Sequence, residues 1–195
     1  YAALGRRDQA LRCYEHALHI RKQLLGERHP DLIPSFENLG DLCFDGGDYI
    51  AALDYYRRSL FVMESGTLNT NNPSGASLLH KLAQCYQYEG DYQRALELHM
   101  KAATGLVQAF GKKHPIVAGL WNNIGNCYAA QHAFGQAATY YRLAEHIYLS
   151  ERDEDGNSNL ALVYNNLGLC YTGRSALVFF RKSENLLPSY PTPVL

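Results

Sequence analysis

The sequence predicts an all-α protein made of consecutive antiparallel helix pairs, and two regular markers support this prediction. The small residue that opens the second helix of each pair stands at Ala10, Ala52, Ala95 and Ala137, at steps of 42, 43 and 42 residues. A capping pair precedes each first helix, at His29-Pro30, Asn72-Pro73, His114-Pro115 and Asn157-Ser158, at steps of 43, 42 and 43. Two independent markers with one period indicate an internal repeat, in which each helix pair buries its apolar face against its neighbours.

The residues between these markers are also repeated. Leu39-Gly40 is followed by Gly47-Asp48-Tyr49, and the same text returns as Leu82-Ala83 and Gly90-Asp91-Tyr92, as Ile124-Gly125, and in a degraded copy as Leu167-Gly168. The pattern resembles the tetratricopeptide repeat (TPR), which places small residues where two helices touch. An ordinary TPR has about 34 residues, and the longer unit with His-Pro before its first helix resembles the TPR variant of kinesin light chains. The resemblance implies a right-handed superhelical solenoid, with first helices on the concave face and second helices outside.

Helical periodicity and end signals locate the individual helices. The first carries Leu11, Tyr14, Leu18 and Leu25 on one stripe and ends at Gly26. Each later first helix begins with an N-cap residue followed by proline, where a missing N–H has no cost, and the Gly-Asp pair separates it from its second helix. These signals predict helices over residues 5–25, 30–45, 48–64, 74–89, 91–110, 115–131 and 133–150, followed by a polar loop at 151–156 and a helix capped by Asn157 or Ser158.

The repeat positions divide the chain into one continuous array over residues 1–187. Its expected parts are a partial repeat (1–26), three full repeats (27–66, 67–111, 112–152) and a shortened repeat (153–187), and residues 188–195 form a proline-rich tail or linker that cannot be helical. Tyr1 aligns with tyrosines inside later first helices, so we expect the chain to be a fragment whose first repeat is incomplete.

The last repeat is shorter than the others. Nine residues separate Tyr86 from Ala95, but only five separate Tyr171 from Ala176. The missing residues, about one helical turn, fall where the Gly-Asp turn should be. Either the last hairpin is truncated or residues are lacking here, and we favour the second interpretation.

Composition excludes several classes of function. A net charge of −1 and a pI near 6.8 give no basic surface for nucleic acid, and no apolar run reaches the length of a membrane span. Cys85, Cys127 and Cys170 occupy one repeat position and no zinc-type spacing exists, so these thiols are expected to pack in the core. We therefore expect a cytoplasmic protein, with cytoskeletal association left open, and no metal or cofactor. No catalytic motif is present, so we expect no enzymatic activity.

The resemblance to TPR proteins implies that a peptide would bind to the first helices, in the concave groove. The corresponding positions here lie around each Leu-Gly pair and at one-turn spacings from it. They are Glu37, Asn38, Asp41 and Phe44 in the second repeat, His80, Lys81, Gln84 and Tyr88 in the third, Asn122, Asn123 and Asn126 in the fourth, and Asn165 and Asn166 in the fifth. Residues at i and i+4 share a helical face, so these positions form parallel ribs.

The many amides in this set have two interpretations. Asn and Gln offer both donors and acceptors, so a ladder of them can pair with the backbone of an extended peptide without requiring charge. Alternatively, the Asn just before each Leu or Ile bonds to a neighbouring helix. Both interpretations stay open for Asn38, Asn123 and Asn166, whereas peptide binding is favoured for Asn122, Asn126, Asn165, Gln84 and His80.

Charge narrows the expected partner. TPR proteins that clamp acidic peptide tails, and kinesin light chains that bind acidic tryptophan motifs, use cations in this groove, where only Lys81 is available. Glu37, Asp41 and Asp45 instead form an acidic rib. This rib favours a partner with a basic segment near the second repeat.

The expected function is therefore that of a non-catalytic adaptor that binds a protein or peptide. Two alternatives remain: a structural scaffold that assembles through its convex face or its ends, and a regulatory TPR segment of a larger enzyme. Extra chain in the groove would support the adaptor, and contacts through second helices would support the scaffold.

Overall fold

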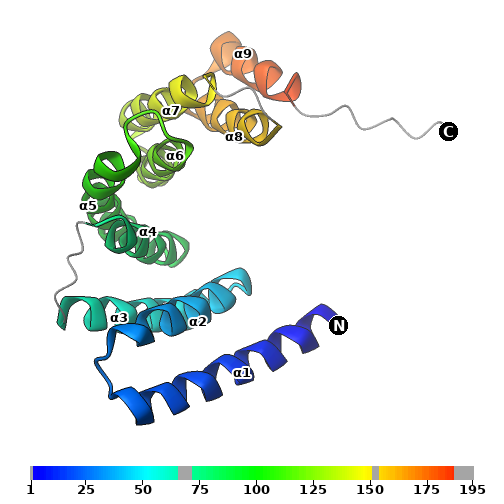
Figure 1. The fold of residues 1–195 in the computed structure, drawn as a ribbon. Helices are drawn as coiled ribbons and strands as arrows, with labels where there is room; N and C mark the ends of the chain where they lie inside the picture. Colours follow the sequence, from blue (N-terminus) through cyan, green and yellow to red (C-terminus); the bar gives the residue numbers. More distant parts are fainter. Residues whose placement is uncertain (1, 66–71, 151–153, 187–195) are drawn as a thin grey trace. The chain divides into compact units, whose positions relative to one another are not determined.

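The computed structural model describes residues 2–65, 72–150 and 154–186, and the chain divides into two compact units, residues 1–109 and 110–195. The fold class is confirmed: the described residues form helices connected by turns (Figure 1). The first unit contains α1 (Ala2–Leu25), a 3-10 turn η1 (Pro30–Leu32), α2 (Ile33–Asp45), α3 (Tyr49–Ser65), α4 (Pro73–Tyr88) and α5 (Tyr92–Phe110), which ends at the boundary. The second unit contains α6 (Pro115–Ala130), α7 (Phe134–Tyr148), α8 (Glu154–Cys170) and α9 (Gly173–Glu184).

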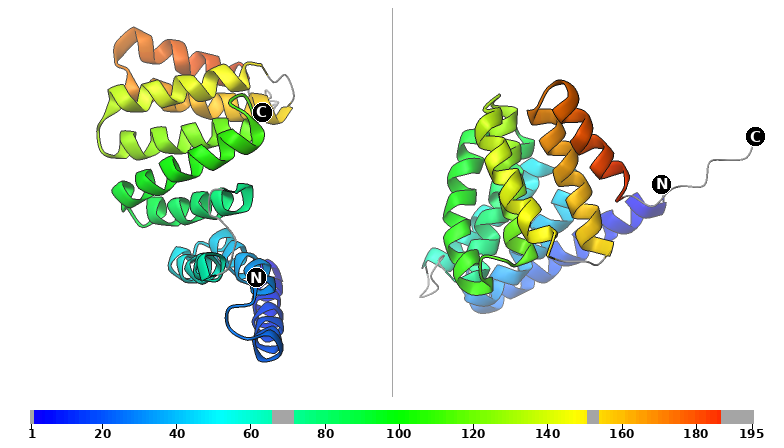
Figure 2. Two further views of the ribbon diagram at one scale, coloured as in Figure 1. Left: turned by 60° about the vertical axis from the view of Figure 1, so that its left-hand side comes forward. Right: turned by 90° about the horizontal axis from the view of Figure 1, so that it is seen from above.

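Helices that follow one another in sequence pack as antiparallel neighbours within each unit. In the second unit, α6 to α9 lie side by side in chain order (Figure 2), and α6 also contacts α8. The first helices of successive repeats are therefore direct neighbours, as are the two helices of each pair. This is the arrangement of a helical repeat array.

The predicted N-caps are present at three helix starts. The Nδ1 atoms of His29 and His114 accept hydrogen bonds from the backbone N–H two residues later, both at 3.2 Å. Asn72 Oδ1 accepts from Gly75 N at 2.7 Å. Each cap is followed by proline in the first turn, so the sequence signal was read correctly.

Three helix starts differ from the prediction. The predicted helix over 30–45 is divided: because Pro34 has no N–H to donate to the Pro30 carbonyl, Ile33 bonds to it instead in a 3-10 turn, and the α-helix follows. α1 begins at Ala2 rather than at residue 5, through residues that favour helix. α8 begins at Glu154, so the predicted cap at Asn157 or Ser158 is wrong.

Other predictions fall partly or wholly outside the described residues. Tyr1, the tail 188–195 and the first half of the predicted loop at 151–156 lie there, whereas residues 154–156 belong to α8. The last hairpin, by contrast, is described, and α8 and α9 pair through a short turn at Tyr171-Thr172.

A glycine in the first helix lets the second helix approach closely in three pairs. A Cβ atom added to Gly40 would collide with the Tyr56 ring, and one on Gly125 would collide with the Tyr141 ring. Gly168 has the same relation to Phe180. Tyr56 and Tyr141 are almost completely buried, at 1% and 2% exposure. The predicted reason for these glycines, close contact between two helices, is therefore confirmed.

The core follows from this packing. In the first unit it contains, among others, Leu32, Phe36, Leu39, Val62 and Leu82. The stripe predicted on α1 is only partly buried, because Leu18 is buried whereas Tyr14 and Leu25 are exposed. Tyr14 stands at the repeat position of Tyr56, but no described first helix covers it in the same way.

The turns inside three helix pairs have the same hydrogen bonds. Asp48 N bonds to Cys43 O at 3.0 Å, and the equivalent bonds of Asp91 and Ala133 measure 2.9 Å. The residue before each of these has a positive φ: Gly47 (+80°), Gly90 (+84°) and, in the third pair, His132 (+60°). A left-handed conformation costs a residue with a Cβ about 1–2 kcal/mol.

We predict that restoring Gly-Asp at this third turn stabilises the protein. His132→Gly removes the strain of the positive φ, and Ala133→Asp supplies the side-chain cap that α7 lacks. Asp48 and Asp91 provide this cap to the N–H groups of Ala51 and Arg94. Each change is expected to raise the free energy of unfolding by about 1 kcal/mol in urea denaturation.

The reverse exchange is the control for this prediction. Gly90→Ala places a Cβ on a residue with φ of +84° and should lower the free energy of unfolding by about 1 kcal/mol. An unchanged midpoint for both His132→Gly and Gly90→Ala would contradict the argument.

Candidate functional site

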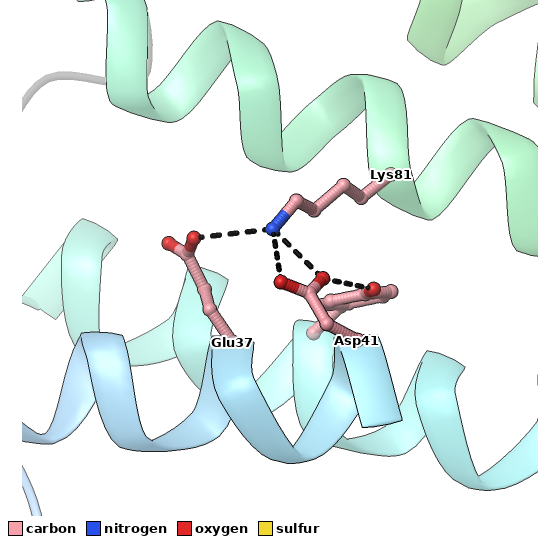
Figure 3. Close-up of polar contacts among 4 residues, drawn as sticks. Glu37, Asp41 and Lys81 are labelled. Atoms are coloured by element: carbon pink, nitrogen blue, oxygen red, sulfur yellow. Dashed lines mark hydrogen bonds and ion pairs between the residues drawn. The ribbon is translucent and has the colours of Figure 1, made fainter. Parts of the chain in front are cut away.

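The first helices α2 and α4 are joined by a charged network. Lys81 Nζ on α4 lies 2.8 and 2.9 Å from the two carboxylate oxygens of Asp41 and 3.6 Å from Glu37 Oε2, both on α2 (Figure 3). The Tyr56 hydroxyl donates to Asp41 Oδ1 at 2.6 Å. Two of the predicted groove positions therefore bind a third from the next repeat.

Spacing and burial explain this arrangement. Glu37 and Asp41 are one turn apart, so their side chains point the same way and one ammonium can reach both. Partial burial raises the pKa of Glu37, and the charge of Lys81 opposes that rise. Burial, followed by the hydrogen bond to Asp41, also raises the pKa of the Tyr56 phenol, so Tyr56 remains a hydrogen-bond donor.

The second unit contains a neutral network in the same geometry. Asn166 Nδ2 on α8 donates to Asn122 Oδ1 at 3.0 Å and to Asn126 Oδ1 at 3.1 Å, both on α6. The Tyr141 hydroxyl donates to the same Asn126 oxygen at 2.8 Å. Burial raises the pKa of Tyr141 as well.

The two networks are copies of each other. Each residue of the second stands 85 residues after its counterpart in the first, and the counterparts are 37 and 122, 41 and 126, 56 and 141, and 81 and 166. One donor from the next first helix serves two acceptors on the previous one, and a buried tyrosine supports the second acceptor. We call this arrangement the inter-repeat clasp. For Asn166 the structure bears out the interpretation that this amide bonds to a neighbouring helix.

Four other predicted site residues take no part in the clasp. Asn38 and Asn165 are exposed on α2 and α8, and Gln84 and Asn123 are half-buried. We call the exposed side of α2 and α4, and separately of α6 and α8, the first-helix surface of each unit. In each unit, the polar side chains at the centre of this surface are mostly used by the clasp.

His80 lies against the second helix of its own pair. Its Nδ1 is 3.2 Å from Nδ1 of His99 on α5, so one ring donates and the other accepts. Burial lowers the pKa of His80 to about 4 and, together with His80, that of His99 to about 3. His99 has no exposed surface, and its Nε2 is buried without a partner. His80 thus belongs to the packing between α4 and α5.

Phe44 and Tyr88 belong to an aromatic group at the C-terminal ends of α2 and α4. Tyr88 is stacked on Tyr49, with ring centroids 4.2 Å apart and planes at 8°. Phe44 contacts both tyrosines edge-on, at 5.3 and 5.5 Å. Tyr88 is 61% exposed, so the ring face opposite Tyr49 is open to solvent.

Four participants were not among the predicted site residues: Tyr49, His99, Tyr56 and Tyr141. Tyr56 and Tyr141 each carry a hydroxyl that orders a first-helix acceptor. The offset of 85 residues is shared by other equivalent positions, such as Gly40 and Gly125, so spacing alone does not single out the clasp. No sequence signal distinguishes Tyr49 from the equivalent Tyr92.

The cysteines were correctly interpreted as core residues in most repeats. Cys43, Cys85 and Cys127 are buried free thiols, and Cys170 is half-buried. Burial raises the pKa of Cys85 and Cys127 to about 12, which keeps them protonated and unreactive. Among the described residues there is no cluster of three or more side chains suited to a metal.

The helix pairs and their repeated contacts define a helical repeat protein, and comparison with known proteins identifies which kind. A sequence profile of the tetratricopeptide repeat matches residues 1–65 and 76–150, which is more than half of the chain. The chain therefore belongs to the tetratricopeptide repeat family. Within the described residues, no helix is both long and apolar enough to cross a membrane.

Particular relatives support the resemblance to kinesin light chains. The chain is 27% identical to Protein KINESIN LIGHT CHAIN-RELATED 1 of Arabidopsis thaliana, over 98% of its own length but 31% of that protein. It thus spans about a third of this relative. Its fold is similar to that of BtubC (BKLC) from P. vanneervenii, with a TM-score of 0.78, 23% identity, and coverage of 95% of this chain and 72% of that one. RapI in its apo form has a TM-score of 0.76 at 18% identity, with coverages of 92% and 64%.

The clasp makes a prediction about charge. Lys81→Met leaves two partly buried carboxylates beside each other and should lower the free energy of unfolding by about 1–2 kcal/mol. Replacing Glu37, Asp41 and Lys81 together by Asn gives the first unit the same neutral clasp residues as the second unit. This triple variant should stay within about 1 kcal/mol of the original protein.

Urea denaturation at low and high salt measures both effects. The loss in Lys81→Met should shrink at high salt, which screens the repulsion between the carboxylates, whereas the triple variant should show little salt dependence at this site. If the triple variant were less stable than Lys81→Met, the two networks would not be interchangeable.

The histidine pair makes a prediction about pH. Because both pKa values are lowered in the folded state from 6.5, the unfolded chain binds more protons below that pH. The contribution of this pair to the free energy of unfolding is fully present above about pH 6.5. It falls as the pH decreases toward about 4, by up to about 1.4 kcal/mol per pH unit for each histidine.

A triple variant tests this origin of acid sensitivity. His80→Asn, Ala83→Gly and His99→Tyr introduce the residues found at these positions in the next repeat. The variant should lose most of the pH dependence of urea denaturation between pH 6.5 and 4, whereas exposed His16→Asn should retain it. Identical pH profiles for the original protein and the triple variant would assign the acid sensitivity elsewhere.

Proposed function

We propose that this chain is a non-catalytic protein-interaction module whose first-helix surface binds a peptide segment of a partner protein. The observation that carries the proposal is that the first helices bear two sets of polar residues, one that joins neighbouring helices and one that is exposed. Clasp residues hold neighbouring first helices in register, while Asn38, Tyr88 and Asn165 remain exposed beside them. A rigid helical surface with exposed amide and aromatic groups suits recognition of an extended backbone. Membership of the TPR family supports an interaction role.

The proposed partner carries a basic segment near α2. Asp41 and Glu37 are already paired with Lys81, so the acidic rib offers less free charge than its sequence suggests. No described ion pair includes Asp45, which is exposed at the end of α2. This carboxylate favours a positively charged partner group. A cytoplasmic location, with association to the cytoskeleton, is consistent with the kinesin light chain-related relative.

A second candidate function is assembly through the second helices. Ile50 and Phe61 on α3, and Leu177 and Val178 on α9, are 53% to 69% exposed. Large apolar side chains at the surface are typical of contact sites when they lie together. The two candidates make different predictions about which helices must stay accessible.

Peptides selected from a random displayed library, followed by affinity measurements, distinguish peptide binding by the first helices from assembly through the second helices. Adding bulk and charge with Asn38→Arg should weaken peptides bound to the first-helix surface of the first unit by about tenfold, equivalent to about 1.4 kcal/mol, and Asn165→Arg should do the same for peptides bound to that of the second unit. Both residues are exposed, so folding should be unaffected. Matched variants on second helices, Glu97→Arg and Gln136→Arg, should change affinity by less than about twofold.

The opposite result would support the second function. If the variants on second helices reduced binding, and those on first helices did not, the interaction surface would lie on α3, α5, α7 and α9. Failure to select any peptide, together with self-association of the chain, would also contradict peptide binding.

A further inference from the structure

An aromatic platform lies at the ends of α2 and α4, and α2 ends at Asp45, a carboxylate with no ion-pair partner among the described residues. Tyr88 rests on Tyr49 with nearly parallel rings, and Phe44 closes one side of the pair. The clasp does not use these rings. With 61% of its surface exposed, Tyr88 presents one ring face to solvent.

The helix geometry places Asp45 on the side of α2 that faces α4. Lys81 reaches Glu37 and Asp41 on the neighbouring helix, and Tyr88 is two turns beyond Lys81 on the same side of α4. Asp45 is one turn beyond Asp41 on α2. The contact between Phe44 and Tyr88 shows that the two helix ends meet here.

Three physical effects favour the same kind of ligand at this point. The open face of a tyrosine ring attracts a cation, and arginine can also stack flat on it. Asp45 is a carboxylate for which the described residues offer no ion-pair partner, and Asp48 and Glu89 nearby are exposed acidic residues. Asp45 and Tyr88 are the last residues of their helices, where the helix dipoles also favour positive charge.

The chain already uses this type of contact elsewhere. The Arg142 guanidinium lies over the rings of Tyr171 and Phe179, at 6.0 and 5.7 Å from their centroids. Arg57 and Arg94 lie over the Tyr86 ring, at 5.5 and 5.6 Å. At Tyr88, by contrast, the described residues contribute no such cation, although the ring is more exposed.

We propose that the Tyr88 platform binds an arginine side chain of a partner protein, stacked on the open ring and paired with Asp45. The proposal rests on the proposed function in that it names one contact of the peptide, but it concerns a separate subsite. Arginine suits this subsite better than lysine, since its planar guanidinium can stack and donate to a carboxylate at once.

Nuclear magnetic resonance with a minimal probe tests the subsite directly. The complete chain, labelled in its tyrosine rings, is titrated with N-acetyl-arginine amide and with N-acetyl-citrulline amide, which has nearly the same shape but no charge. The arginine probe should shift the Tyr49 and Tyr88 signals and bind about fivefold more tightly than the citrulline probe, from the cation–π contact and the ion pair together.

Two variants and two matched controls locate the binding. Tyr88→Leu and Asp45→Asn should each reduce the affinity for the arginine probe at least about threefold. Tyr14→Leu removes an exposed tyrosine from α1, and Glu64→Gln removes an exposed carboxylate at the far end of α3. Neither control should change the titration. Equal binding of the two probes, or unchanged binding in Tyr88→Leu, would overturn the proposal.

This outcome is distinct from failure of the proposed function. Selected peptides that bind through Asn38 or through Asn165 but contain no arginine requirement would leave peptide binding in place and remove the arginine subsite. Conversely, specific binding of the arginine probe by a chain that selects no peptides would support the subsite and contradict the wider peptide surface.

Discussion

The contact between a glycine and an aromatic ring controls the packing of three of the helix pairs. Gly40, Gly125 and Gly168 each lie against the ring of a residue on the following helix. Without a Cβ, the first helix lets the ring approach its backbone, and the two helices pack closely along their length. When that ring is a tyrosine, the same packing brings its hydroxyl to the polar side of the first helix. There the hydroxyl donates a hydrogen bond to Asp41 or Asn126. Packing within a pair thus orients a polar group that joins one pair to the next.

The clasp shows that geometry and charge are separable in this array. One copy uses an ammonium and two carboxylates, and the other uses three amides, in matching positions. A charged copy has stronger individual contacts but requires partly desolvated ions, as the raised pKa of Glu37 indicates. A neutral copy avoids that cost. The pattern ends in the last pair, where Phe180 has no hydroxyl and the position equivalent to Asp41 is an exposed Leu169.

The sequence predicted features that depend on local chemistry and missed those that depend on neighbouring repeats. Proline after an N-cap and glycine with positive φ act within a few residues, so the helix ends near 30, 73, 115 and 47 were found. The direction of Lys81 and Asn166 depends on how one first helix lies against another, and spacing within a helix does not determine this. His80 was expected on the peptide surface from its repeat position, but its ring contacts His99, which stands where two other pairs have a tyrosine.

The clasp also limits where a partner can be recognised. Acceptors at the centre of a first helix are used by the next first helix, so a ligand that required them would have to displace a contact that holds the array together. The groups that remain lie beside the clasp, as Asn38 and Asn165 do, or at the helix ends, as Tyr88 and Asp45 do. Helix ends differ between repeats here: the position of Asp45 holds Tyr88 in the next repeat and Ala130 in the one after. Variation at these ends can change what is bound without disturbing the clasp, because no clasp residue depends on them. If the first helices bind a peptide as proposed, specificity has a physical reason to reside at the ends of these helices and stability at their centres.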